Sequence, residues 1–158
     1  MSVRAGLGVD AHRFGGGRPL MLGTLRIEYP LGLAGHSDGD VVVHAVCDAL
    51  LAAAGEPDIG ALFPPGDPEW AGASGERLLA TVVERLRERG LRPLSAHAVV
   101  VCEEPRLAPH RERMQQALSA AVGAAVTVHA TTTDGMGFTG RGEGIACQAV
   151  ALVAEVAG

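Results

Sequence analysis

Two histidines and one aspartate in the first third of the chain could form a metal site. Asp10 and His12 follow an alternating apolar segment, residues 3–9, which predicts a β-strand. Residues two apart in an extended segment point to the same side, so both side chains can face one point. His44 lies in an apolar stretch that has the features of a helix. Two imidazoles and a carboxylate suit a catalytic zinc ion, with a fourth position left open for water or substrate.

This pattern also has an interpretation that needs no metal. Asp-x-His tripeptides are common, and on spacing alone Asp10-Ala11-His12 is a loop turn and His44 a half-buried helix residue. Asp40 and Asp48 lie one turn on either side of His44, on the same helical face. A carboxylate near a metal-bound histidine would orient its ring through the second nitrogen.

A second polar cluster, His36-Ser37-Asp38-Gly39-Asp40, comes at the start of a helix that we expect over residues 38–54. Ser37 or Asp38 can cap this helix, with acidic residues in its first turn and Gly55 at its end. The free N–H groups of a helix start can also hold an anion. Capping does not explain His36, which either donates a hydrogen bond to a phosphate or faces solvent.

A third cluster runs from Thr131 to Gly144 and is rich in glycine. It combines three consecutive threonines, five glycines within residues 135–144, and Arg141. Hydroxyl groups, free backbone N–H groups and a guanidinium suit phosphate binding, and glycine lets a ligand approach the backbone closely. The Gly-Lys-Ser/Thr ending of a Walker A loop is absent. The alternative is a polar turn between two strands.

The remaining elements follow from hydrophobic periodicity and from glycine and proline signals. Residues 20–25 and 26–29 predict a hairpin around Gly23-Thr24, and residues 58–73 predict a loop. Further helices are expected over residues 74–89 and 109–122 and further strands over residues 96–102 and 126–132, whereas residues 143–157 fit either type. We predict one α+β (mixed α/β) domain over residues 1–158, a two-layer sandwich of a mixed sheet with helices packed on one face.

Composition excludes several classes of protein. The chain has 158 residues, 47% of them hydrophobic and 20% charged, which is typical of a globular domain. A net charge of −5 without a basic run disfavours nucleic acid as a partner. No apolar run approaches the about 20 residues of a membrane span, and the N-terminus has no secretory h-region. Cys47, Cys102 and Cys147 are odd in number and lie in apolar segments, so we expect reduced thiols and a cytoplasmic protein.

Together the clusters resemble the 2-C-methyl-D-erythritol 2,4-cyclodiphosphate synthase family of the non-mevalonate isoprenoid pathway. The similar blocks run in family order over nearly the whole chain. They are Gly8-x-Asp10-x-His12, His36-Ser37-Asp38-Gly39-Asp40-x-x-x-His44, Asp58-Ile59-Gly60-x-Leu62-Phe63-Pro64, Thr131-Thr132-Thr133 and Gly137-Phe138-Thr139-Gly140-Arg141-Gly142-Glu143-Gly144.

The resemblance implies a homotrimer with active sites at its subunit interfaces, and a phosphorus-oxygen lyase activity. The substrate would be 4-diphosphocytidyl-2-C-methyl-D-erythritol 2-phosphate, which closes to 2-C-methyl-D-erythritol 2,4-cyclodiphosphate and releases CMP. The resemblance places a divalent metal, usually Zn²⁺, on Asp10, His12 and His44. A second cation, Mg²⁺ or Mn²⁺, would bridge the α- and β-phosphates of the substrate, with Asp134 as its candidate ligand.

The resemblance also implies roles for individual residues. His36 and Thr132 would stabilise the transition state, and residues 102–108 and 131–134 of a neighbouring subunit would cradle the cytidine diphosphate. The complete set of implied substrate-binding residues is Asp10, His12, His36, Ser37, Asp58, Ile59, Gly60, Phe63, Asp67, Cys102, Pro105, Arg106, Leu107, Ala108, Ala130, Thr131, Thr132, Thr133, Asp134, Phe138 and Arg141.

Three positions depart from the family pattern. Asp134 stands where Glu is common, so its carboxylate is one methylene shorter. Arg106 stands where Lys is common and presents a planar fork instead of a point charge. Pro65 stands where many members have Asp after Phe-Pro, so a contact from that carboxylate cannot form here; Asp67 is the candidate to replace it.

The sequence is also compatible with two other functions. A zinc-dependent phosphohydrolase would use the same three metal ligands to activate a water molecule. A non-catalytic trimeric ligand-binding protein would need neither bound metal nor turnover.

Overall fold

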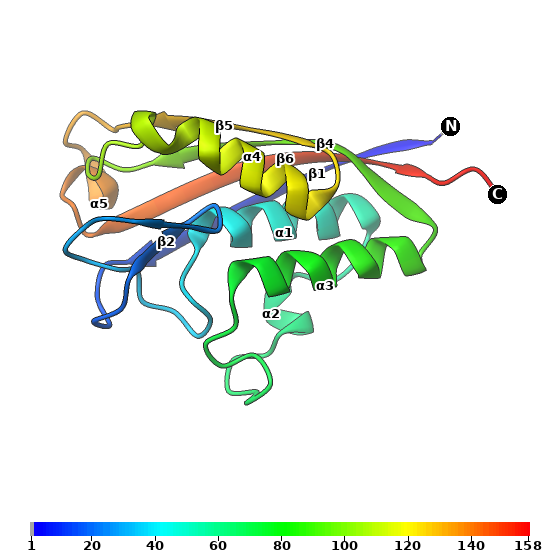
Figure 1. The fold of residues 1–158 in the computed structure, drawn as a ribbon, viewed down its shortest axis with the longest axis horizontal. Helices are drawn as coiled ribbons and strands as arrows, with labels where there is room; N and C mark the ends of the chain where they lie inside the picture. Colours follow the sequence, from blue (N-terminus) through cyan, green and yellow to red (C-terminus); the bar gives the residue numbers. More distant parts are fainter. Residues whose placement is uncertain (1) are drawn as a thin grey trace.

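The computed structural model describes residues 2–158, and a four-stranded sheet forms its centre. The strand order is β1 (Val3–Arg13), β6 (Gly144–Glu155), β4 (Leu91–Val101) and β5 (Ala125–Thr131). β6 runs antiparallel to both β1 and β4, whereas β4 and β5 are parallel. β1, β4 and β5 therefore run in one direction, and β1 and β5 are the two edges of a mixed sheet (Figure 1).

Three longer helices pack beside this sheet. α1 (Val41–Ala54) contacts β1 and β6, α4 (Arg111–Val122) contacts β5, and α3 (Gly75–Glu88) contacts α1 and β4. The smaller elements are the hairpin of β2 (Leu20–Leu22) and β3 (Leu25–Ile27), the short helices α2 (Ile59–Leu62) and α5 (Gly137–Gly140), and the 3₁₀-helix η1 (Ala108–His110). Within residues 2–158, no helix is both long and apolar enough to cross a membrane.

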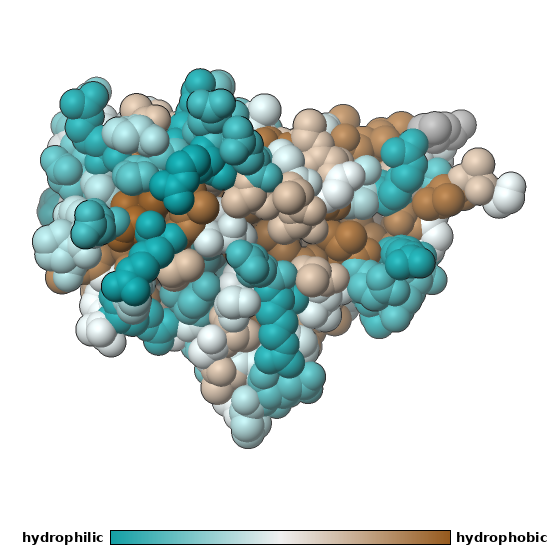
Figure 2. Space-filling model, viewed as in Figure 1, coloured by the Kyte–Doolittle hydropathy of each residue, from teal (hydrophilic) through white to brown (hydrophobic). Residues whose placement is uncertain are grey.

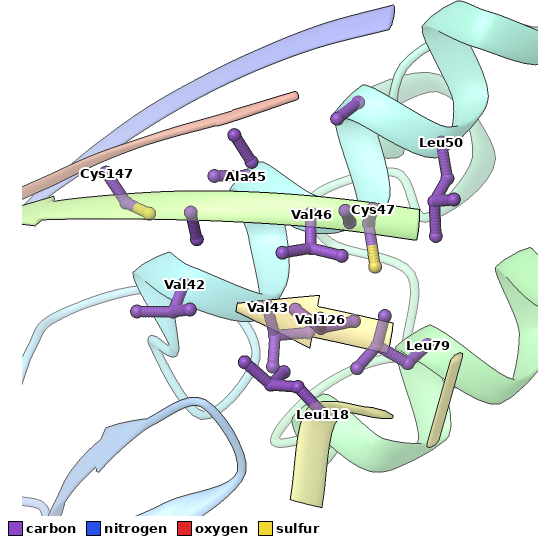
Figure 3. Packing of buried hydrophobic residues seen from close by; sticks show 14 of the residues in the cluster. Val42, Val43, Ala45, Val46, Cys47, Leu50, Leu79, Leu118, Val126 and Cys147 are labelled. Atoms are coloured by element: carbon purple, nitrogen blue, oxygen red, sulfur yellow. The ribbon is translucent and has the colours of Figure 1, made fainter. Parts of the chain in front are cut away.

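The core is centred on α1, which is buried on nearly every side. Every residue of α1 is buried except Asp48 and Ala52, because the sheet covers one side of the helix and α3 another. Figure 3 shows Val43 and Val46 of α1 among Leu79, Leu118 and Val126 of three other elements. These side chains are aliphatic and branched, so a sequence with few aromatic residues still forms one continuous core.

Two glycines of β1 let α1 lie directly on the strand. A Cβ added at Gly6 would come within 2.1 Å of the carbonyl oxygen of Ala49, and one at Gly8 within 2.0 Å of that of Ala45. No side chain can occupy either position without moving the helix backbone. This close approach brings His44, the neighbour of Ala45, beside the C-terminal half of β1.

In residues 2–158, no helix covers the opposite face of the sheet. Leu7 and Val9 of β1 are about 60% exposed there, and Val150 and Leu152 of β6 are also exposed. Leu7 pairs directly with Val150, so these side chains form one apolar patch across the two strands. On the face viewed in Figure 2, hydrophobic surface also extends toward the two chain ends at the right.

The structure confirms the mixed α+β class and every predicted helix and strand, with some different boundaries. β1 continues through Asp10 and His12 to Arg13, and β4 begins at Leu91 rather than at residue 96. The ambiguous run 143–157 forms β6, since β1 and β4 pair with it on both sides. The expected loop 58–73 contains α2, and the glycine-rich cluster between Thr131 and Gly144 contains α5.

The predicted cap of the first long helix is wrong. The cap is Asp40, whose carboxylate accepts a hydrogen bond from the Val43 amide, and the first turn of α1 contains no acidic residue. Asp38 instead accepts from the amides of Asp40 and Gly75. Ser37, Asp38 and Asp40 are all potential caps by residue type. Because the carboxylate of Asp38 is used in other contacts, Asp40 caps the helix.

Candidate active site

Asp10, His12 and His44 meet at one point, as the first interpretation of the sequence required. Oδ2 of Asp10 lies 2.7 Å from Nε2 of His12 and 3.1 Å from Nδ1 of His44. The two histidine nitrogens are 3.0 Å apart. All three donor atoms lie within 4.8 Å of one another, in an arrangement that could hold a metal ion. We call these three residues the triad.

The outer nitrogen of each imidazole is fixed by a neighbour. Nδ1 of His12 donates to the carbonyl oxygen of Ala34 at 2.7 Å, which leaves a lone pair on Nε2. Nε2 of His44 lies 2.8 Å from the hydroxyl of Ser37, and by donating to it leaves a lone pair on Nδ1. The expectation that a carboxylate orients the histidines is therefore wrong, because a carbonyl and a hydroxyl do so.

The electrostatics of the triad favour a cation at its centre. When both imidazoles are neutral, with the proton on the outer nitrogen, two imidazole lone pairs and a carboxylate oxygen face the same small volume. Burial raises the pKa of Asp10, but the hydrogen bonds and charges of His12 and His44 outweigh it and lower that pKa to about 2. Burial lowers the pKa of His12, yet the hydrogen bond and charge of Asp10 raise it overall. Two nitrogen donors and one carboxylate fit zinc.

Asp40 and Asp48 support the site from a distance instead of touching the triad. The buried carboxylate of Asp40 accepts from the amides of Gly23 at 2.9 Å and Thr24 at 2.8 Å, and so ties the β2–β3 turn to the start of α1. Asp48 accepts from the amide of Ile59 at 2.9 Å. This second contact fixes the start of α2 beside α1.

A pocket of about 260 Å³ opens over the triad, and we call it the triad pocket. The walls come from β1, from α1 and the segment before it, from α2 and the loop that follows it, and from α3. Its lining residues are Asp10, His12, His36, Ser37, His44, Ile59, Gly60, Phe63, Pro65, Trp70 and Leu78. The triad and the apolar side chains of this lining suit a ligand that has both an anionic and an apolar part.

The segment that carries His36 and Ser37 is held in place by backbone contacts. The guanidinium of Arg18 donates to the carbonyl oxygens of Ser37 and, at 2.7 Å, of Gly35. The carbonyl oxygen of His36 accepts from the amide of Gly72 at 3.0 Å. The ring Nε2 of His36 lies 3.3 Å from the carbonyl oxygen of Asp67, so His36 contacts the loop after α2 through both its backbone and its ring.

A second pocket lies at the C-terminal end of β5, and we call it the β5 pocket. It is lined by Cys102, Glu103, Pro105, Arg106, Leu107, Ala108, Ala130, Thr131 and Thr132. Glu103 joins its two walls, because its carboxylate accepts from the amides of Thr133 at 3.2 Å and Gly135 at 3.1 Å. Burial and the charges of the two adjacent glutamates raise the pKa of Cys102 to about 11, so its thiol is neutral.

The two pockets share no lining residue and lie on opposite edges of the sheet. Asp10 and His12 are near the C-terminal end of β1, and Thr131 ends β5. Since β1 and β5 run in the same direction, both pockets lie at the same end of the sheet. Three strand spacings, roughly 14 Å, separate those edges.

Comparison with known proteins decides the family. The model described as the YgbB family matches residues 3–154. The chain belongs to the YgbB family. It is 48% identical over 156 residues to the "2-C-methyl-D-erythritol 2,4-cyclodiphosphate synthase" of Moorella thermoacetica, over 97% of this chain and 96% of that protein.

Relatives of the YgbB-family chain also include larger proteins. It is 46% identical to the "Bifunctional enzyme IspD/IspF" of Erythrobacter litoralis over 97% of its own length, but spans 40% of that protein. Among solved structures, the bifunctional IspDF of Campylobacter jejuni superposes with a TM-score of 0.93 at 35% identity, over 98% of this chain and 42% of the other. A 2C-methyl-D-erythritol-2,4-cyclodiphosphate synthase in its CDP-bound form superposes with a TM-score of 0.87 at 37% identity. This match covers 96% of this chain and 100% of the other.

Several residues predicted for the YgbB-family site line neither pocket. Asp58 caps α2 through the amide of Ala61, and Asp67 accepts from the amide of Glu69. Arg141 pairs with Glu143 at 2.8 Å. The remaining three are Thr133, whose hydroxyl contacts that of Thr139 at 3.0 Å, Asp134, whose φ is 53°, and Phe138, which is exposed.

Sequence reasoning missed Arg18, Trp70 and Leu78, and it included Glu103 only within the range 102–108, without a role of its own. Arg18 and Glu103 act through backbone atoms of other segments, and that kind of contact leaves no sequence signal. Trp70 and Leu78 line the triad pocket. Trp70 had a weak signal, as the only tryptophan of a chain with few aromatic residues, placed in a loop rich in proline and glycine.

Proposed function

We propose that this chain converts 4-diphosphocytidyl-2-C-methyl-D-erythritol 2-phosphate to 2-C-methyl-D-erythritol 2,4-cyclodiphosphate and CMP, as a phosphorus-oxygen lyase of isoprenoid biosynthesis. The observation that carries the proposal is the triad in the wall of a pocket, in a chain that matches a named synthase over 97% of its length. In the reaction an oxygen of the 2-phosphate bonds to the β-phosphorus. The bond from that phosphorus to the oxygen it shares with the α-phosphate breaks, and CMP leaves with that oxygen.

This reaction needs no nucleophile from the protein, because both reacting groups belong to one substrate. The chain has to bend the substrate until its ends meet, and to stabilise negative charge. We propose that Ile59, Gly60 and Phe63 hold the methylerythritol in the triad pocket. Asp58, one of whose oxygens caps α2, has a second oxygen for a substrate hydroxyl. Ser37 lies on the His44 side of the same pocket, near the expected phosphate.

Asp10, His12 and His44 fit a resident divalent cation, and we propose that they hold Zn²⁺. Bound there, it supplies Lewis acidity toward the substrate diphosphate and orients it. The outer hydrogen bonds to Ala34 and Ser37 keep both imidazoles turned toward the ion. A Mg²⁺ or Mn²⁺ ion that arrives with the diphosphate would take Asp134 as a candidate ligand.

Side chains beside the reacting phosphates would stabilise the transition state. We propose this role for His36, whose ring lines the triad pocket, and for Thr132, which lines the β5 pocket. The cytidine diphosphate would bind in the same β5 pocket, against Cys102, Pro105, Arg106, Leu107, Ala108, Ala130 and Thr131. Further candidates for substrate contact are Asp67, Thr133, Phe138 and Arg141.

The two pockets suggest how the chain assembles. In one chain the two pockets occupy opposite edges of the sheet at the same end, roughly 14 Å apart, so a substrate bent to bring its ends together would not span both. Rotation about an axis along the strands brings the β5 edge of one copy to the β1 edge of the next, and such head-to-tail contacts close into a ring. The apolar patch of Leu7, Val9, Val150 and Leu152 would be covered in that ring. We therefore propose a homotrimer with a divided active site at each interface.

The activity is tested by incubating the purified chain with the cytidyl substrate, Zn²⁺ and Mg²⁺, and following products by ³¹P NMR. Equimolar CMP and a cyclic diphosphate are expected. Linear phosphate products would instead identify a zinc-dependent phosphohydrolase, and no turnover in a chain without stoichiometric metal would identify a binding protein. Reduced, buried thiols at Cys47, Cys102 and Cys147 agree with the proposed cytoplasmic location.

The divided site is tested by mixing two inactive variants. His44→Ala removes the triad half, and Thr132→Ala removes the β5 half. In a mixed trimer some interfaces combine an intact triad with an intact β5 pocket, so activity should reappear after subunit exchange. If each site lies within one chain, the mixture stays inactive. Sedimentation analysis of the wild type gives the number of subunits separately.

A further inference from the structure

A stack of three side chains lies between the triad pocket and the surface. The guanidinium of Arg77 covers the Trp70 ring, with Cζ 4.4 Å from the ring centroid. Trp70 in turn meets Phe63 edge-on, at 4.4 Å between centroids. Arg77 also donates to the carbonyl oxygen of Glu69 at 2.8 Å and faces the carboxylate of the same residue at 3.7 Å. Arg77 of α3 therefore contacts two consecutive residues, Glu69 and Trp70, of the loop that joins α2 to α3 (Figure 1).

Trp70 forms the wall between two cavities. Together with Phe63 it lines the triad pocket on one side, and on the other an outer groove along α3 lined by Leu62, Ala80, Thr81 and Arg77. The same loop is bonded to His36 through the carbonyl of Asp67 and the amide of Gly72. Displacement of the indole would open the triad pocket to the outer groove.

The position of Arg77 in its own helix argues against a role in stabilising that helix. Arg77 is the third residue of α3, and its amide donates to the Ser74 cap at 3.2 Å. A cation in the first turn opposes the helix dipole. Arg85 and Arg87, in the last turn, have the favourable placement and pair with Glu56 and Glu84. The contacts that Arg77 makes are with the loop.

We propose that Arg77 is a positioning residue that acts through Trp70: it holds the indole against Phe63 and so sets the wall of the substrate pocket. This role rests on the proposed function, because the pocket wall concerns the part of the substrate that does not react. Binding by such a wall is equal in ground state and transition state, so its loss raises KM more than it lowers kcat. Guanidinium and ammonium groups both attract the face of an indole, so lysine can replace arginine in part.

The experiment compares Arg77→Ala, Arg77→Lys and the control Arg87→Ala, an exposed arginine of the same helix. Trp70 is the only tryptophan, so tryptophan fluorescence, excited selectively over that of Tyr29, reports this wall alone. In the ligand-free proteins, Arg77→Ala should emit at longer wavelength, and acrylamide should quench it about twofold more strongly than wild type. Its KM should rise about fivefold with kcat within about twofold. Arg77→Lys should recover most of both properties, and Arg87→Ala should match wild type.

Each outcome decides a separate point. Unchanged quenching and unchanged KM in Arg77→Ala would overturn the proposal. A fall in kcat at constant KM would also overturn it, since that result means that the loop acts on His36 instead of on the pocket wall. If wild type releases no CMP, the proposed function fails, yet the quenching comparison still tests whether Arg77 holds the indole. Circular dichroism of each variant shows whether α3 has been kept.

Discussion

The Cα atom of Gly8 lies so close to the carbonyl oxygen of Ala45 that a Cβ there would come within 2.0 Å of it. This contact fixes the distance between β1 and α1. His44 precedes Ala45, and Asp10 follows Gly8 by two residues on the same face of the strand. The geometry of the triad is therefore set by backbone packing before any metal binds.

Gly8→Ala tests this relationship. The added methyl group has to push α1 away from β1, which should cost about 1–3 kcal/mol of stability because the helix backbone cannot yield locally. Zinc affinity should fall together with stability, since His44 moves with the helix. Urea unfolding and chelator competition measure the two effects. Arg4→Ala on the same strand, where the side chain is exposed and paired with Glu155, should leave both unchanged.

Ser37→Ala tests the orientation of His44. The variant leaves Nε2 of His44 without its acceptor at 2.8 Å, so the ring loses its preferred rotation and tautomer. Changes to such outer partners typically weaken metal binding by about 10-fold or more. Competition against a chromogenic chelator gives the affinity, and Ser95→Ala is the control. An affinity equal to wild type would assign the orientation of His44 to packing alone.

Glu103→Ala tests the connection between the walls of the β5 pocket. Without the carboxylate, the amides of Thr133 and Gly135 lose their acceptor, and the segment that carries Thr132 becomes less ordered. We expect KM for the substrate to rise about 10-fold, with little change in stability, because the segment is exposed. The neighbouring exposed Glu104→Ala is the matched control. Equal KM values for the two variants would contradict the role given to Glu103.

Glu56 should make stability depend on pH in the acidic range. The hydrogen bond from Arg85 at 2.8 Å, together with the charges of Arg85 and Arg89, outweighs desolvation and lowers the pKa of Glu56. A lowered pKa contributes stability that is complete above the unfolded-state value and is lost as pH falls through the folded-state value. Glu56→Gln should therefore be less stable than wild type at pH 7, and the difference should shrink below about pH 4.5. Urea unfolding at several pH values, with Glu28→Gln as the control, measures it.

The elements that carry the triad could be predicted from sequence, but the reason why they meet could not. Alternation indicated a strand up to Asp10, and apolar content with helix signals placed His44 in a helix. Gly6 and Gly8, spaced two apart in that strand, were the signal for a close helix, because only glycine permits that approach. Sequence spacing does not say which helix approaches.

The partners of the triad show a second limit of sequence reasoning. Asp40 and Asp48 have the right spacing to orient His44, yet both carboxylates bind backbone amides elsewhere. A backbone carbonyl such as that of Ala34 has no residue type by which a sequence could reveal it. The C-terminal run was ambiguous for a related reason, since only pairing with β1 and β4 makes it a strand.

The placement of the three cysteines has a practical consequence. Cys47, Cys102 and Cys147 are all buried, and burial raises the pKa of each thiol. Alkylating reagents and oxidants attack the thiolate, so all three sulfur atoms should resist them in the folded chain. A cysteine introduced on an exposed position of α3 would then be the one that a maleimide dye labels. The native sequence can therefore carry a single fluorophore without first removing its own cysteines.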